Sequence, residues 1–255
     1  MVRLSPAFAR GFGGEALNGI WRDHMRKAFL CLLLTAVAVI AHAGDARAQQ
    51  TLNFSLGYFT PLGSDARVQD DVLAVNQTFL VFDVKDFNGV SIGGEWLVPL
   101  SNYFEGGLGI SFSRRTVPSV YQDYIDSDGT EVEQDLRLRL VPISFTFRVV
   151  PLGQQNPVQP YFGAGLNVIN WRYSEFGEFI DFGRAGFPVF EDTFVATGNS
   201  VGPVVLGGIR FGSDNATAGF EIRYQKGEDD LDDRFAGRKL DLGGWTYNFT
   251  AGVRF

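Results

Sequence analysis

The stretch WTYNFTAGVRF, residues 245–255, carries the clearest structural signal in the chain. Every second side chain in it is apolar, and the side chains between are polar or small. The apolar positions are Trp245, Tyr247, Phe249, Ala251, Val253 and Phe255. A repeat of two residues is the pleat of a β-strand, so this stretch predicts a strand with one apolar and one polar face.

The same alternation recurs upstream, in segments separated by turn residues. Together with the last one, the predicted strands cover 51–60, 88–100, 103–115, 135–150, 159–173, 200–212, 216–227 and 241–255. Their apolar faces carry bulky aliphatic and aromatic side chains, whereas the opposite faces carry Gly, Ser, Thr, Asn and some charges. Lipid outside a narrow polar lumen accounts for that distribution. The sequence therefore predicts an all-β fold, an eight-stranded antiparallel up-and-down transmembrane β-barrel over residues 49–255. Periodicity by itself also leaves a soluble β-sandwich open.

The lengths of the connections predict how the barrel is oriented. Short turns are expected around 101–102, 151–158 and 213–215, and long loops at 61–87, 116–134, 174–199 and 228–240. Outer-membrane barrels have short periplasmic turns and long outer loops. An even number of strands then places both termini on the periplasmic side.

A proline interrupts the pattern of the fourth segment. Pro142 lies where the apolar alternation changes phase, from Leu140 to Ile143. Because proline cannot donate to the strand ladder, we expect a β-bulge near Val141–Pro142.

The start of the chain has the parts of an export signal. Residues 25–48 contain Arg26 and Lys27, an apolar run of 14 residues and small-residue cleavage patterns. That run is shorter than the roughly 20 residues of a membrane-spanning helix. We expect cleavage after Ala48, with residues 1–24 a non-native extension upstream of the signal peptide. The mature protein is then expected in the cell outer membrane of a Gram-negative bacterium.

With these patterns, the mature chain resembles the small outer-membrane barrels of the OmpA/OmpX type over essentially its whole length. The resemblance covers the barrel only, without a peptidoglycan-binding domain. Its most specific feature is the closing strand with a terminal Phe255. In such families a strand of this kind is the signal for the barrel-assembly machinery, which implies that Phe249, Val253 and Phe255 serve assembly here.

Composition excludes several classes of function. Cleavage after Ala48 leaves 16 basic and 26 acidic residues, a net charge of −10, so nucleic acid is not an expected partner. The only cysteine and both histidines lie in the removed part, which predicts no catalytic triad, no cofactor and no His/Cys metal site. Catalysis by carboxylates alone stays open.

The Asp126–Gly129 segment has part of a calcium-loop spacing, but Tyr124 stands where the first ligand belongs, so no metal is expected.

Charged residues on the inward face are the first candidate site. They are Glu95, Glu105, Arg148, Arg210, Glu221, Arg223 and Arg254. Charges in a narrow lumen have to be paired, which predicts a salt-bridge network that plugs the barrel. A selectivity ring in a narrow channel is the functional alternative.

The long loops are the second candidate site. Two of them are acidic, and the third is rich in phenylalanine: Phe176, Phe179, Phe182, Phe187, Phe190 and Phe194. These rings could fold over the barrel mouth, line a path for an apolar ligand, dock a partner, or form the small core of strands extended beyond the membrane.

The sequence therefore predicts a non-enzymatic barrel with a structural or surface-interaction role through its acidic and aromatic outer loops. Its expected contacts are outer-membrane lipid, lipopolysaccharide, the barrel-assembly machinery and an extracellular or envelope partner. The alternative is a narrow channel for small apolar or amphipathic solutes.

Overall fold

A computed structural model describes residues 49–126 and 128–255 of the chain; the predicted extension (1–24) and signal peptide (25–48) lie outside the described residues. The elements are β1 (Thr51–Pro61), η1 (Ser64–Ala66), α2 (Val72–Asn76), η2 (Val84–Phe87), β2 (Gly89–Pro99), β3 (Phe104–Ile125), β4 (Glu131–Val149), β5 (Val158–Ile180), β6 (Val189–Gly212), β7 (Ala216–Gln225), β8 (Glu228–Asp230), β9 (Lys239–Asp241) and β10 (Gly244–Arg254). No helix in this part of the chain is long and apolar enough to cross a membrane.

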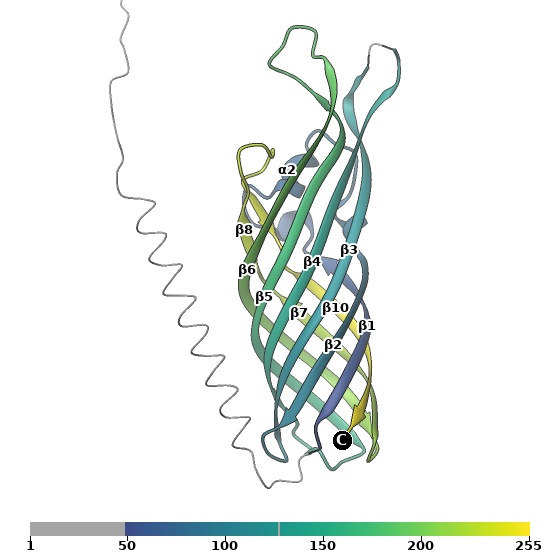
Figure 1. The fold of residues 1–255 in the computed structure, drawn as a ribbon, viewed down its shortest axis with the longest axis vertical. Helices are drawn as coiled ribbons and strands as arrows, with labels where there is room; N and C mark the ends of the chain where they lie inside the picture. Colours follow the sequence, from purple (N-terminus) through teal and green to yellow (C-terminus); the bar gives the residue numbers. More distant parts are fainter. Residues whose placement is uncertain (1–48, 127) are drawn as a thin grey trace, which may run out of the picture. The chain divides into compact units, whose positions relative to one another are not determined.

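Eight of these strands close into one antiparallel ring, in the order β1-β10-β7-β6-β5-β4-β3-β2 (Figure 1). Each of the eight predicted segments is a strand of this ring, so the transmembrane barrel is confirmed. The ring closes between the first and last strands, where Gln50 and Phe255 exchange backbone hydrogen bonds of 2.9 and 3.0 Å. The short turns lie at this same end of the barrel (Figure 1).

β3, β5 and β6 are much longer than predicted, and β4 begins four residues earlier than predicted. β3 and β4 continue to Ile125 and from Glu131, and β5 and β6 continue to Ile180 and from Val189. The predicted loops 116–134 and 174–199 are therefore mostly strand, and they form two hairpins that project beyond the other strands (Figure 1). The pairing of β5 with β6 runs without a break from Val158–Phe211 to Ile180–Val189.

In the half of the barrel that contains Gln50 and Phe255, the apolar side chains point outward. Phe54 and Phe249 are 61% and 71% exposed, which is the surface that a lipid bilayer covers. The inward positions of β4 in this half are Ser144, Thr146 and Arg148, all buried. This half is therefore apolar outside and polar inside.

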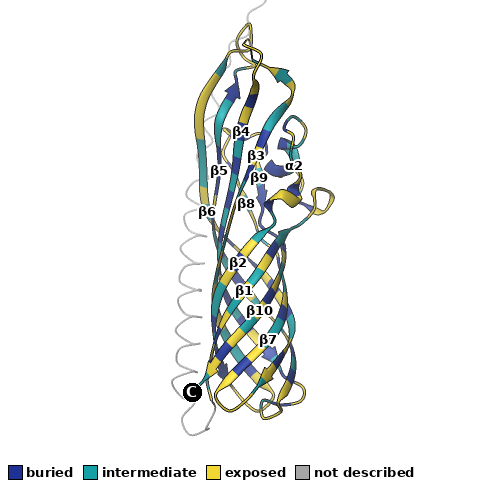
Figure 2. Cartoon of the chain, turned by 90° about the vertical axis from the view of Figure 1, so that its right-hand side faces the viewer, coloured by how far each residue is buried: buried dark blue, intermediate teal, exposed yellow. Residues whose placement is uncertain are grey.

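In the projecting half the two faces exchange their chemistry. Along β4 the inward residues become Leu136, Leu138 and Leu140, all buried, while Arg137 and Arg139 lie outward. Even-numbered residues stay inside along the whole of β4, so the strand keeps its phase and only its environment changes. In Figure 2 exposed and buried residues alternate along the strands of the barrel wall, whereas the projecting parts of β4 and β5 are mostly buried or half-buried.

The predicted β-bulge at Val141–Pro142 is wrong, because β4 keeps its phase at this point. β3 pairs with β4 in one register on both sides of Pro142, from Ile110–Ile143 to Ser113–Leu140. The apparent change of phase in the sequence is the level at which the apolar face moves from outside to inside. The register shift of this pair lies higher, between Val120 and Ile125.

Two connections fold over the mouth of the barrel and complete an apolar core there, which we call the outer cap. Residues 62–88 contribute Val72, Leu73, Leu80, Val84 and Phe87, and residues 226–243 contribute Leu231, Phe235, Leu240 and Leu242. The projecting strands contribute Val117, Leu136, Leu138, Leu140, Ile169, Trp171 and Tyr173. The outer half thus has the interior of a water-soluble domain, built on strands that continue from the membrane.

Candidate functional site

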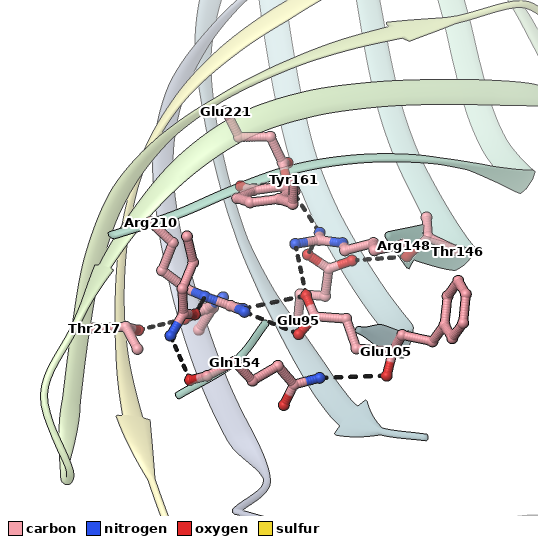
Figure 3. Close-up of polar contacts among 12 residues, drawn as sticks. Glu95, Glu105, Thr146, Arg148, Gln154, Tyr161, Arg210, Thr217 and Glu221 are labelled. Atoms are coloured by element: carbon pink, nitrogen blue, oxygen red, sulfur yellow. Dashed lines mark hydrogen bonds and ion pairs between the residues drawn. The ribbon is translucent and has the colours of Figure 1, made fainter. Parts of the chain in front are cut away.

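The lumen of the membrane half is filled by a cluster of buried ion pairs, which we call the ionic plug (Figure 3). Arg148 of β4 is at its centre and is 1% exposed. Its guanidinium pairs with Glu95 of β2 and lies 2.9 Å from Glu221 of β7 and 3.8 Å from Glu105 of β3. Strands that are not neighbours in the ring are thereby joined across the lumen.

Two more arginines extend the plug. Arg210 of β6 donates to both carboxylate oxygens of Glu105, at 3.2 and 2.9 Å. Arg223 of β7 contacts Glu95 at 2.7 Å and also pairs with Glu221. A bidentate arginine–carboxylate contact, such as that of Arg210 with Glu105, neutralises the charge and also fixes the relative orientation of the two side chains.

Six of the seven predicted lumen charges therefore belong to one network. Arg254 is at its edge: it donates 2.9 Å to Gln159 Oε1 and 3.1 Å to the Ser213 carbonyl, and it has no ion pair within the described residues. Gln159 also accepts from Arg210 Nε at 2.9 Å, so Arg254 is linked to the plug through an amide.

The sequence prediction missed Gln159 and Tyr161. The Tyr161 ring lies under two guanidinium groups, with its centroid 4.8 Å from Arg148 and 5.7 Å from Arg210, and its hydroxyl donates 3.0 Å to Glu221. Both residues occupy inward positions of β5, so the alternation of that strand could have identified them.

A glycine next to the plug makes room for it. A Cβ atom at Gly107 would lie 2.4 Å from Thr146 Oγ1 and 2.8 Å from Glu95 Oε1. An inward side chain there would displace Glu95. The small inward residues of the predicted strands are thus required by the size of the charged side chains opposite them.

Between the ionic plug and the outer cap lies a small polar cavity of about 30 Å³. Its lining includes Asn53, Ser55, Ser91, Ser144, Asn167, Gln225, Thr246 and Asn248. The volume suits one or two water molecules.

The outer cap is held by a buried charged contact between its two connections. Arg67 lies 2.5 Å from Asp71 Oδ1 and donates 2.7 Å to the Asp241 carbonyl. Asp71 in turn accepts 2.6 Å from the Asp241 backbone N–H, and Asp241 Oδ2 accepts 3.0 Å from the Val68 N–H. This contact, the Arg67–Asp71–Asp241 latch, ties residues 62–88 to residues 226–243.

Glu175 is buried in the cap and forms no ion pair with any described residue. Glu175 accepts hydrogen bonds from Asn76 Nδ2 at 2.7 Å and from the Tyr173 hydroxyl at 2.8 Å. Burial raises the pKa of Glu175, although both hydrogen bonds act in the opposite direction.

The six predicted phenylalanines do not form a loop. Phe176 and Phe179 lie in β5, Phe190 and Phe194 lie in β6, and only Phe182 and Phe187 lie in the turn between them. The Phe179 ring is 4.8 Å from that of Phe194 and 5.9 Å from that of Phe190. Of the alternatives left open by the sequence, the strand extension with its own small core describes Phe179, which is buried, and Phe194, which packs against the core. Phe190 is exposed, and the Phe176 ring lies under the outward Arg137 guanidinium.

The two turn phenylalanines are exposed and close to the other projecting hairpin. Phe182 and Phe187 contact each other at 5.7 Å between ring centroids. The Tyr124 hydroxyl, from β3, donates 2.7 Å to the Phe187 carbonyl. Ile125, at the end of β3, is exposed as well, so both hairpin tips present apolar side chains to their surroundings.

The three residues assigned to assembly share the lipid-facing side of β10. Phe249, Val253 and Phe255 are all exposed, in keeping with the alternation of that strand. Nothing in their geometry gives them a second role.

No group of three or more His, Cys, Asp or Glu side chains within residues 49–126 and 128–255 is placed to hold a metal ion. The carboxylates of the plug are all engaged by arginine.

Comparisons with known proteins relate the chain to outer-membrane barrels by its fold alone. No protein-family model and no curated protein sequence matches it. The outer membrane protein OprG of Pseudomonas aeruginosa is similar with a TM-score of 0.50 and 12% identity, over 82% of this chain and 96% of OprG. Ail, the attachment invasion locus protein of Yersinia pestis, gives a TM-score of 0.42 at 12% identity, over 82% and 100%. The outer membrane protease OmpT of Escherichia coli gives 0.40 at 13% identity, over 83% and 97%. The chain therefore has the fold of an outer-membrane β-barrel.

Proposed function

We propose that this protein is a non-enzymatic outer-membrane barrel that acts through its projecting half, in surface contacts or in maintaining the envelope, and does not conduct solutes. The ionic plug carries the proposal. It joins β2, β3, β4, β6 and β7 across the lumen through buried ion pairs. A solute would have to separate these charges, and then the outer cap, to pass.

The construction of the projecting half supports a role in contacts. Four strands extend past the lipid-facing wall, and the cap gives them a folded core. Their tips expose Ile125, Phe182 and Phe187, whereas apolar side chains elsewhere in this half are mostly buried. Exposed apolar groups on a stable support are typical of a surface that binds a partner.

The proposed orientation places the termini and short turns in the periplasm and the two hairpins outside the cell. The partners would be outer-membrane lipid and lipopolysaccharide along the wall, the barrel-assembly machinery at the closing strand, and an extracellular or envelope partner at the tips. The lack of histidine and cysteine after residue 48, and the pairing of the plug carboxylates, support a role without catalysis.

Planar-bilayer recording tests the closed lumen. The protein is produced from the full chain, purified from the outer membrane and compared with its Arg148→Ala variant. The wild type is expected to be silent. Discrete openings of the wild type would contradict the proposal and favour the alternative, a narrow channel for small apolar or amphipathic solutes.

Truncation of the tips tests the role of the projecting half. Replacing residues 181–188 by a short Gly-Asn turn leaves the β5–β6 pairing and the cap in place. Cells with this variant are expected to lose the surface attachment or detergent resistance that the wild type restores to a deletion strain. Full restoration of both by the truncated protein would show that the tips carry no function.

A further inference from the structure

Three arginines lie directly opposite one another on the outer face of three neighbouring strands. Arg114 of β3 pairs in register with Arg139 of β4, and Arg139 pairs with Arg172 of β5. All three occupy outward positions, as the alternating burial of their strands shows. Residues opposite each other in an antiparallel pair have Cβ atoms about 5 Å apart, so this arginine row concentrates three positive charges.

The arginine row has no counter-charge among the described residues. The ion pairs formed by arginines among residues 49–126 and 128–255 use Arg67, Arg148, Arg184, Arg210, Arg223, Arg234 and Arg238, and none uses a member of the row. Like charges directly opposite each other destabilise a sheet. A row of this kind in a folded protein indicates that an anion from outside the chain lies on it.

Among the described residues, only one donor of the row makes a side-chain hydrogen bond. Arg139 Nη2 makes one long contact of 3.3 Å with Asn170 Oδ1, and Arg139 Nε is buried without a hydrogen-bond partner. The adjacent Arg137 differs, because its Nε donates 2.9 Å to Thr116 and its guanidinium lies 4.6 Å from the Phe176 ring centroid. The row therefore offers free guanidinium forks, whose geometry matches the oxygens of a phosphate group.

The position of the row selects the source of that phosphate. Arg114 and Arg139 are the first outward residues beyond the apolar band on their strands, directly after Phe112 and Val141. On β5 the apolar band ends at Val168, and Arg172 is the second outward residue beyond it, after Asn170. In the proposed orientation, the end of the apolar band is the level at which the acyl chains of the outer leaflet end and its headgroups begin.

We infer that Arg114, Arg139 and Arg172 form a binding site for the phosphate-bearing headgroup of an outer-leaflet lipid, of the phosphorylated glucosamine type found in lipopolysaccharide. The acyl chains of that lipid would cover the apolar wall of β3, β4 and β5, and its phosphate would neutralise the row. This site is separate from the hairpin tips and does not depend on what the tips bind.

The test compares two triple variants with equal loss of charge. The first is Arg114→Gln, Arg139→Gln and Arg172→Gln. The matched control is Arg184→Gln, Arg234→Gln and Arg238→Gln, whose arginines are exposed and pair with Asp181, Asp232 and Asp233. Each protein, made from the full chain, is placed in phosphatidylcholine nanodiscs with added lipid A, and bound lipid A is counted by native mass spectrometry.

Wild type and control are expected to bind lipid A alike, and the row variant about tenfold more weakly or worse, because each lost guanidinium removes charge-assisted hydrogen bonds. Lipid A without its phosphates should bind the wild type as weakly as the row variant binds intact lipid A. Equal binding by row variant and wild type, or equal loss in row variant and control, would overturn the site. Competition by millimolar inorganic phosphate alone would show a free-anion site instead of a lipid site. Thermal unfolding of both triple variants verifies that they are folded.

Discussion

The membrane half and the projecting half of this barrel are made from the same strands, yet they bury opposite kinds of side chain. Along β4 the inward residues change from Thr146 and Arg148 to Leu138 and Leu140 without a change of phase. Lipid accepts apolar groups on the outside, so the inside of the membrane half can hold ions if they are paired. Contact between apolar side chains and water is unfavourable, so the projecting half has to bury its apolar face. One β-strand geometry therefore serves two solvents.

The largest effect is expected from removing the centre of the ionic plug. Arg148→Met would leave Glu95 and Glu221 short of a buried counter-charge, at a cost of about 3–5 kcal/mol in the free energy of unfolding. Urea unfolding in lipid vesicles, followed by tryptophan fluorescence, measures this cost. The control is Arg184→Met in an exposed turn, and an Arg148→Met midpoint equal to that of the control would refute the account of the membrane half.

An apolar truncation should act locally in the projecting half. Leu138→Ala empties a buried position of the outer cap, which costs about 2–5 kcal/mol. Hydrogen exchange of the α2 amides should accelerate accordingly, because α2 packs on that core. The matched change on the lipid-facing side of β5, Leu166→Ala, is expected to leave the α2 amides unchanged. Equal acceleration by both variants would mean that the two halves are not separate.

The Arg67–Asp71–Asp241 latch should contribute less. Asp71→Asn keeps an acceptor for the start of α2 but weakens the charged contact with Arg67, at a cost of about 1.5–3 kcal/mol to the cap. Trypsin added to intact proteoliposomes should then cut within residues 62–88 faster than in wild type. Asp83→Asn, at the exposed start of η2, is the control, and resistance equal to that of the control would argue against the latch.

The smallest effect concerns pH. Burial raises the pKa of Glu175 in the folded protein above its value in the unfolded chain. At pH values between these two pKa values, the folded state therefore binds more protons than the unfolded state. The cap should therefore gain stability as pH falls through that window and lose it as pH rises. Glu175→Gln should flatten this dependence in hydrogen-exchange measurements of the cap. A pH profile identical to wild type would assign the effect to another group.

The strand count and the lipid-facing sides were predictable because each follows from alternation within a short segment. Trp245 to Phe255 show this best: their faces follow from sequence order alone. Six of the seven lumen charges were found in the same way. Gln159 and Tyr161 also occupy inward positions of β5, but they were missed because only the charged inward residues were selected and these two are neutral.

The lengths of the strands were not predictable from the same signal. Alternation identifies a strand but not the solvent beside it, so the exchange of faces near Pro142 resembled a bulge, and residues 116–134 and 174–199 resembled loops. Their apolar face points inward only because residues 62–88 and 226–243 cover it, and those segments are distant in the chain.

The sequence by itself determined that this chain forms a closed barrel of eight alternating strands, because a period of two with bulky groups on one side is a local property. The tertiary structure decided that the lumen is closed by paired ions, that the outer half has a core, and that Arg114, Arg139 and Arg172 stand opposite one another. Those features depend on register between strands, and register is set by packing across the whole ring.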